Sequence, residues 1–173
     1  MSKESYVNTY SGLNVLSYKG PDVHPLMGLL SQEFPNWSAK KINSYMNLVF
    51  SKQDDTGGVL VARNEAFYYV GILIYTFQKI DSNIFKNSEE SRKSVPLKDI
   101  IVVENLIASS PILQKEVFMT LINSSIKIGN LHSCAYIELP NYENDNLKLL
   151  ELKYSGKIKK EGFRTYIELK DSK

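Results

Sequence analysis

The sequence predicts a single α/β (α+β) domain in which a mixed, mainly antiparallel sheet of about six to seven strands carries helices on both faces. Strand-like and helix-like segments follow one another in the order β–α–α–β–β–β–α–β–α–β–β. The strand–helix–strand step over residues 99–139 indicates a parallel pair with a right-handed crossover. Two hairpin patterns, at 59–78 and 157–169, indicate antiparallel pairs. Together these three observations predict one mixed sheet over residues 1–173.

The first quarter of the chain contains one predicted strand and two predicted helices. The alternating segment 14–18 (NVLSY) is typical of a strand. A short helix is expected from Asp22 or Val23 to Phe34. A second helix is expected to begin at a Ser38 N-cap. Its apolar residues recur at helical spacing: Ile42, Tyr45, Met46, Val49 and Phe50.

A hairpin and a polar segment follow. Residues 54–58 (DDTGG) predict a turn, and the runs 59–63 and 67–78 predict an antiparallel pair with a tight connection. Residues 79–98 are rich in Ser, Asn, Lys and Glu, and are too hydrophilic for a core. They predict a mobile loop within the domain.

The second half opens with 99–107 (DIIVVENLI), a nearly continuous apolar run that suits a central strand covered on both faces. A helix is predicted from a Ser109-Ser110-Pro111 start to about Ile128, with Gly129-Asn130 as its stop. A strand is expected at 135–139 and a helix at 142–154, closed by Gly156. The last hairpin should place four residues on one face: Phe163, Thr165, Ile167 and Leu169.

Composition excludes several classes of protein. The chain has 173 residues, 43% of them hydrophobic and 23% charged, which is enough apolar material for one core and too little charge for a disordered polyelectrolyte. The formal net charge of +2 argues against a dedicated nucleic-acid binder. The single cysteine, Cys134, excludes an internal disulfide and a multi-cysteine zinc site. With only two histidines, no metal centre is expected.

The sequence predicts a soluble, cytoplasmic protein. Residues 1–12 are polar and lack the apolar core of a secretory signal. The longest apolar stretch, 67–77, is about half of the ~20 residues that a membrane helix needs, and its aromatic and β-branched residues suit a strand.

Glu104 is the most informative candidate for chemistry, since it lies in an apolar strand. A carboxylate in apolar surroundings must be paired, hydrogen-bonded or protonated, and such groups are over-represented at functional sites. The alternative is that Glu104 lies where the strand emerges at the sheet edge and simply makes a hydrogen bond. The junction 108–114 also has two interpretations, either a phosphate site at a helix N-terminus or an ordinary helix capped by Ser110.

The element order, the strand Val103–Ala108 and the apolar helix positions Val117, Leu121 and Ile122 together resemble the GNAT acyltransferase superfamily. The resemblance implies an N-acyltransferase that uses acetyl-CoA as co-substrate and needs no metal. It implies that Glu104 is the base and that Tyr154 protonates the leaving thiolate. It assigns the co-substrate to the strand end and to the loop and first turn of the helix: Leu106, Ile107, Ala108, Leu113, Gln114, Lys115, Glu116, Val117 and Phe118.

The loop departs from the pattern of that superfamily. Leu113 stands at its arginine or glutamine position, and Gln114, Glu116 and Phe118 stand at positions that are often glycine. Two functions therefore follow from the resemblance, either a divergent N-acyltransferase or a GNAT-like binding or regulatory module that has lost CoA binding. An unrelated α/β sensor domain is a third. For the enzyme, the expected acceptor is a small-molecule or peptide amine, and the oligomeric state, a homodimer included, stays open. Neither nucleic acid nor a membrane is an expected partner.

Overall fold

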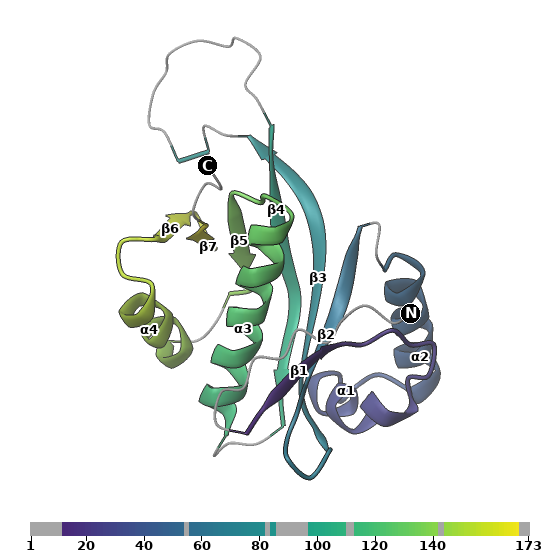
Figure 1. Ribbon diagram of the computed structural model, residues 1–173. Helices are drawn as coiled ribbons and strands as arrows, with labels where there is room; N and C mark the ends of the chain where they lie inside the picture. Colours follow the sequence, from purple (N-terminus) through teal and green to yellow (C-terminus); the bar gives the residue numbers. More distant parts are fainter. Residues whose placement is uncertain are drawn as a thin grey trace. The chain divides into compact units, whose positions relative to one another are not determined.

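The computed structural model describes residues 12–53, 56–81, 84–85, 97–109, 113–141 and 144–169 (Figure 1). Its strands form a seven-stranded sheet in the order β1-β2-β3-β4-β5-β7-β6. The β4–β5 pair is parallel, whereas the pairs β1–β2, β2–β3, β5–β7 and β6–β7 are antiparallel. The predicted mixed, mainly antiparallel sheet is therefore confirmed.

The element order is also the predicted one. The strands are β1 (Asn14–Ser17), β2 (Gly57–Arg63), β3 (Tyr69–Asp81), β4 (Leu97–Ala108), β5 (Tyr136–Leu139), β6 (Ile158–Glu161) and β7 (Arg164–Glu168). The helices are the 3-10 turn η1 (His24–Leu26), α1 (Met27–Glu33), α2 (Ala39–Ser51), α3 (Gln114–Leu131) and α4 (Asn144–Lys153).

The chain divides into two compact units. Unit 1 comprises Met1–Thr76 and Glu104–Ser124, and unit 2 comprises Phe77–Val103 and Ser125–Lys173. The strands β3 and β4 and the helix α3 run from one unit into the other. That the whole chain is one functional domain stays a prediction.

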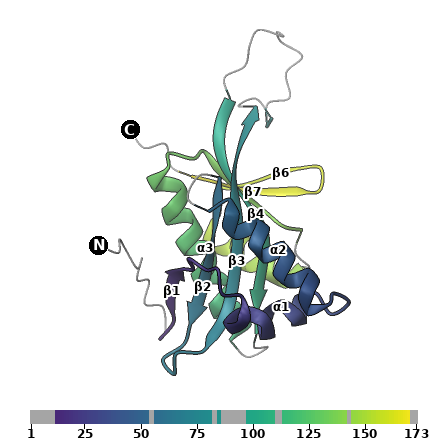
Figure 2. The same ribbon diagram turned by 90° about the vertical axis from the view of Figure 1, so that its right-hand side faces the viewer.

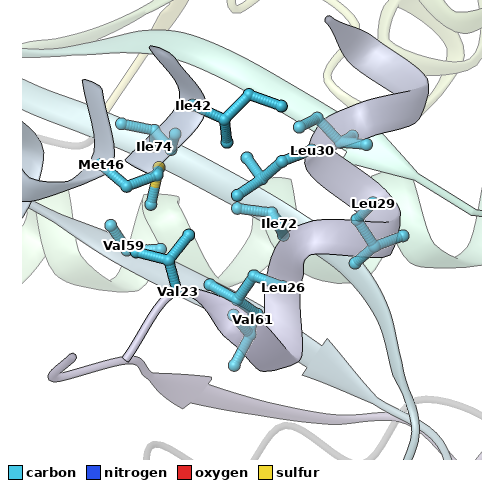
Figure 3. Close-up of a cluster of buried hydrophobic side chains, with 11 residues drawn as sticks. Val23, Leu26, Leu29, Leu30, Ile42, Met46, Val59, Val61, Ile72 and Ile74 are labelled. Atoms are coloured by element: carbon cyan, nitrogen blue, oxygen red, sulfur yellow. The ribbon is translucent and has the colours of Figure 1, made fainter. Parts of the chain in front are cut away.

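The main apolar cluster of unit 1 joins α1 and α2 to the strands β2 and β3 (Figure 3). Its fully buried members include Leu30 of α1, Met46 of α2 and Ile72 of β3. Since Val59 and Val61 alternate with Leu60 and Ala62, only one face of β2 meets these two helices.

The opposite face of the same strands is covered by α3. A Cβ atom added at Gly71 would overlap Cγ1 of Val117 and lie 3.1 Å from Cδ1 of Leu121, so glycine is needed for this close approach. Val117 and Leu121 are both fully buried. The prediction of helices on both faces of the sheet is thus confirmed within unit 1.

Local signals explain why α1 and α2 form where they do. Pro25 occupies the first turn of η1, and Leu26, Leu29 and Leu30 are buried. The Ser38 side chain accepts a hydrogen bond of 3.2 Å from the N–H of Lys41, which confirms the predicted N-cap of α2.

Unit 2 is built around the parallel pair and the last hairpin. The β4–β5 pairs join Ile100 to Tyr136, Ile101 to Ile137 and Val102 to Glu138. Buried Ile80, Ile100, Tyr136 and Tyr166 form its aromatic-rich cluster. The Phe85 ring makes T-shaped contacts with both tyrosines, with ring centroids 5.0 Å apart in each case.

The predicted end of α3 is wrong, because packing overrides a local signal. Gly129 does not end α3, which continues to Leu131. A Cβ at Gly129 would lie 2.5 Å from Cδ1 of Leu169, so glycine serves close packing there. The left-handed residue beyond the helix is Ser133, with φ of 55°.

The aromatic residues at both hairpin turns were also misassigned. Phe67 has a φ of 65° and lies in the turn, so β3 begins at Tyr69, and it runs to Asp81. Phe163 is 90% exposed at the β6–β7 turn, whereas Thr165, Ile167 and Leu169 are buried.

Some predictions lie outside the described residues. They concern the segments 1–11, 82–83 and 86–96, the helix start at Ser110-Pro111, and Tyr142. Among the residues that are described, α3 begins at Gln114, and no helix is long and apolar enough to cross a membrane. Within the same described ranges, no three His, Cys, Asp or Glu side chains gather as metal ligands would.

Candidate active site

Glu104 lies on β4 within unit 1, and its side chain is exposed. Its Oε1 accepts a hydrogen bond of 2.9 Å from the Thr76 hydroxyl on the neighbouring strand β3. The expected apolar surroundings are therefore wrong for this carboxylate, which keeps access to solvent. One of its oxygens is held in place by Thr76, which limits the positions open to the carboxylate.

Strand β4 turns two consecutive side chains toward helix α2. The Tyr45 hydroxyl donates a hydrogen bond of 2.8 Å to Oδ1 of Asn105, while Glu104 lines a cavity together with Tyr45. In a regular strand, neighbouring side chains point to opposite faces. Glu104 and Asn105 both face α2, so the alternation of side chains shifts by one residue here, as it does at a β-bulge. Bulges of this kind re-aim a side chain, here that of Glu104.

The cavity beside Glu104 has a volume of about 170 Å³ and lies entirely within unit 1. Figure 2 shows α2, which forms one wall, lying in front of β3. The α2 residues recur at helical spacing and so share one face of the helix. The lining residues are Tyr45, Leu48, Val49, Lys52, Gly57, Gly58, Ile74, Tyr75, Thr76 and Glu104.

Two glycines make room on the β2 side of this cavity. Gly57 pairs with Thr76 and Gly58 with Tyr75. A Cβ atom at Gly57 would overlap the backbone oxygen of Tyr75, and one at Gly58 would lie 2.6 Å from the Tyr75 hydroxyl oxygen. The Tyr75 phenol therefore lies close against Gly58, and any larger residue would displace it.

The ionisable groups of the cavity differ in character. Burial raises the pKa of Tyr45, and the negative charge of Glu104 raises it further. At neutral pH this phenol is therefore protonated and able to donate its hydrogen bond to Asn105. Among the described residues that line the cavity, Glu104 is the one carboxylate and Lys52 the one ammonium.

The residues assigned to the co-substrate lie in the same unit as Glu104. Ile107 belongs to the buried cluster of unit 1, and the N–H of Ser109 donates to the carbonyl oxygen of Val70 at 2.9 Å. In the first turn of α3, Gln114, Lys115 and Glu116 are exposed, so their side chains can meet a ligand. Leu106, Ala108 and Leu113 are partly buried, and Val117 and Phe118 are buried.

Tyr154 lies in unit 2, just after α4, with none of the other predicted site residues. Its N–H donates to the carbonyl oxygen of Leu150 at 2.8 Å, and Gly156, with φ of 79°, follows it as predicted. A second cavity of about 90 Å³ is lined by Tyr154 together with Ile126, Asn130, Lys157, Ile167, Glu168 and Leu169.

No model of a protein family and no curated protein matches the chain in sequence. Solved structures do match it in fold. An aminoglycoside antibiotic 6'-N-acetyltransferase from Acinetobacter baumannii aligns with a TM-score of 0.59 at 10% identity, over 87% of this chain and 94% of that one. An aminoglycoside N-acetyltransferase in complex with CoA aligns with a TM-score of 0.61 at 13% identity, over 90% and 94%.

The chain has the fold of the GNAT N-acetyltransferases. The resemblance predicted from the sequence is confirmed at this level. A transcriptional regulator from Bacillus halodurans shares the fold too, with a TM-score of 0.61 and 16% identity over 87% of this chain and 96% of that one. Because fold alone does not determine chemistry, the activity has to be argued from the site.

Proposed function

We propose that the protein is an acyl-CoA-dependent N-acyltransferase that transfers an acetyl group directly to an amine. The observation that carries the proposal is the Glu104 carboxylate, which is exposed at a cavity wall and held by Thr76. A general base must be reachable by its substrate and fixed in position, and Glu104 meets both conditions. Acetyltransferases among the structures of the same fold support this choice of chemistry.

The start of α3 fits a diphosphate, although less well than a glycine-rich loop would. A helix N-terminus offers free N–H groups and the positive end of the helix dipole, and Lys115 adds a positive charge. Glu116 in the same first turn adds a negative charge, which weakens the attraction. We therefore expect this segment, Leu113–Phe118, to hold CoA with reduced affinity.

Residues of the chain are assigned to the separate steps of the transfer. Acetyl-CoA, when bound, supplies the acyl group as a reactive thioester. Glu104 accepts the proton that the acceptor amine loses, directly or through one water molecule. Backbone N–H groups near Leu106 and Ile107 polarise the carbonyl oxygen, as the family resemblance implies. The same resemblance assigns to the Tyr154 phenol the donation of a proton to the leaving sulfur.

Ligand-induced stabilisation tests whether CoA binds. We expect millimolar acetyl-CoA and desulfo-CoA each to raise the melting temperature, because a ligand that binds only the folded chain stabilises it by mass action. ATP serves as the control, since it carries phosphates and adenine but no pantetheine. The absence of a shift at millimolar acetyl-CoA would contradict the enzymatic proposal.

A CoA-independent binding module is the second candidate, and the residues at the first turn of α3 favour it. Leu113, Gln114 and Phe118 replace the residues through which the superfamily approaches a diphosphate. One of the structures sharing the fold is a transcriptional regulator. For this function we expect amine ligands to bind at Glu104 without any release of CoA thiol.

Thr76 is a positioning residue in the proposed mechanism, and its replacement by valine tests this. Thr76→Val keeps the shape of the side chain but removes the donor to Glu104, so we expect kcat to fall about fivefold to twentyfold. The KM for acetyl-CoA should not change, and Thr76→Ser should restore most of the activity. A Thr76→Ser enzyme as slow as Thr76→Val would contradict a role for the hydroxyl.

A further inference from the structure

We infer that the acceptor is a small molecule with one amine and one carboxylate at opposite ends of an apolar body, and that polycations are poor ligands. This inference deepens the proposed function and rests on it for the transfer step. The binding preference itself can be measured without acetyl-CoA. It is argued from the charges, the spacing and the apolar lining of the cavity beside Glu104.

The charges of the cavity complement a zwitterion. Among the described residues that line it, Glu104 is the carboxylate and Lys52 the ammonium, whereas Tyr45 is a neutral phenol at physiological pH. An amine is attracted by Glu104, and an anionic group on the same molecule by Lys52. A second positive charge finds no further carboxylate among these residues and is repelled by Lys52.

The two charges belong to different ends of the cavity. Tyr45 lies on α2 and Lys52 is the C-cap residue directly after it, so the helical rise separates the two by roughly 10 Å along the axis. Tyr45 marks the Glu104 end, because its hydroxyl donates to Oδ1 of Asn105, the residue next to Glu104 on β4, at 2.8 Å. A ligand that reaches both charges must therefore extend along α2, with its amine at the Tyr45 end.

The space between the two ends suits an apolar body. Leu48, Val49 and Ile74 contribute aliphatic side chains, and the Tyr75 ring closes against Gly58. The volume of about 170 Å³ is below that of a drug-sized pocket, which is usually several hundred Å³. A compact aromatic or aliphatic spacer fits this description.

Calorimetric titration with three probes of the same aromatic body tests the preference. They are para-aminomethylbenzoate, para-aminomethylbenzamide and para-xylylenediamine, which place a carboxylate, a neutral amide or a second amine opposite the same aminomethyl group. We expect the benzoate to bind about fivefold to tenfold more tightly than the amide, and the diamine to bind more weakly than either.

Reversing the charge of Lys52 should reverse that order. In Lys52→Glu the diamine should bind most tightly and the benzoate least, and in Lys52→Gln the benzoate should lose its advantage over the amide. Lys40→Glu is the matched control, because Lys40 lies on α2 without lining the cavity, and it should keep the wild-type order. Thermal unfolding of each variant checks that it is folded.

Each outcome decides the inference. It is overturned if the diamine equals the benzoate in the wild type, if Lys52→Glu leaves the order unchanged, or if none of the probes binds at about 10 mM. If the benzoate preference and its reversal are found but no CoA thiol is released with acetyl-CoA, the inference stands and the proposed transfer fails. If transfer occurs with the diamine preferred, the proposed function stands and the inference fails.

Discussion

Glu104→Gln is expected to lower kcat for acetyl transfer by about a hundredfold to a thousandfold, because the amide cannot accept the proton that the amine loses. Glutamine has nearly the same shape, and its carbonyl oxygen can still accept the 2.9 Å hydrogen bond from Thr76. The cavity should therefore persist. The affinity for acetyl-CoA should hardly change, since its predicted contacts lie at the end of β4 and at Leu113–Phe118.

Steady-state kinetics with varied amine, together with acetyl-CoA titrations by thermal shift, separate these two effects. Glu33→Gln makes the same chemical change at an exposed position at the end of α1, away from the cavity, and should leave kcat as it is. Turnover in Glu104→Gln equal to the wild type would remove Glu104 from the mechanism. A parallel loss of acetyl-CoA binding would mean that the substitution disturbs the co-substrate site.

Much of the fold could be predicted because its signals are periodic and local. The stripe from Ile42 to Phe50 and the Ser38 cap locate α2, and the run 99–107 locates the central strand. The wrong predictions depended on single residues that can serve more than one structural role. A glycine can end a helix, or it can allow close packing, as Gly129 does against Leu169, and only the packed structure distinguishes the two uses.

Among the residues of the candidate site, the sequence indicates Glu104 and does not indicate the others. Glu104 is conspicuous as a charge in an apolar strand, but its exposure depends on the slipped alternation at Asn105, which the sequence does not reveal. Tyr45 and Val49 belong to an apolar stripe that suggests core alone, whereas both also line the cavity. In the sequence, the pair Gly57-Gly58 suggests a turn. Glycine at the start of a strand can also indicate that another chain segment packs closely against the backbone, as Tyr75 does here.

Leu30→Ala is expected to lower the free energy of unfolding by about 2–5 kcal/mol, since it removes three carbon atoms from a fully buried position. Leu30 belongs to the cluster that joins α1 and α2 to the sheet of unit 1, together with Ile42 and Met46 (Figure 3). The cavity left behind has few ways to collapse, because the neighbouring side chains come from three different elements. Urea unfolding followed by circular dichroism measures the change.

Leu48→Ala is the matched control for this prediction. Leu48 is 55% exposed on α2, so the same truncation there should change stability by less than about 1 kcal/mol. The two variants should also differ in function, since Leu48 lines the cavity, whereas Leu30 belongs to the buried cluster of α1, α2 and the sheet. Leu48→Ala should weaken amine binding at nearly full stability. Equal destabilisation by the two substitutions would mean that the α1–α2 cluster does not dominate the stability of unit 1.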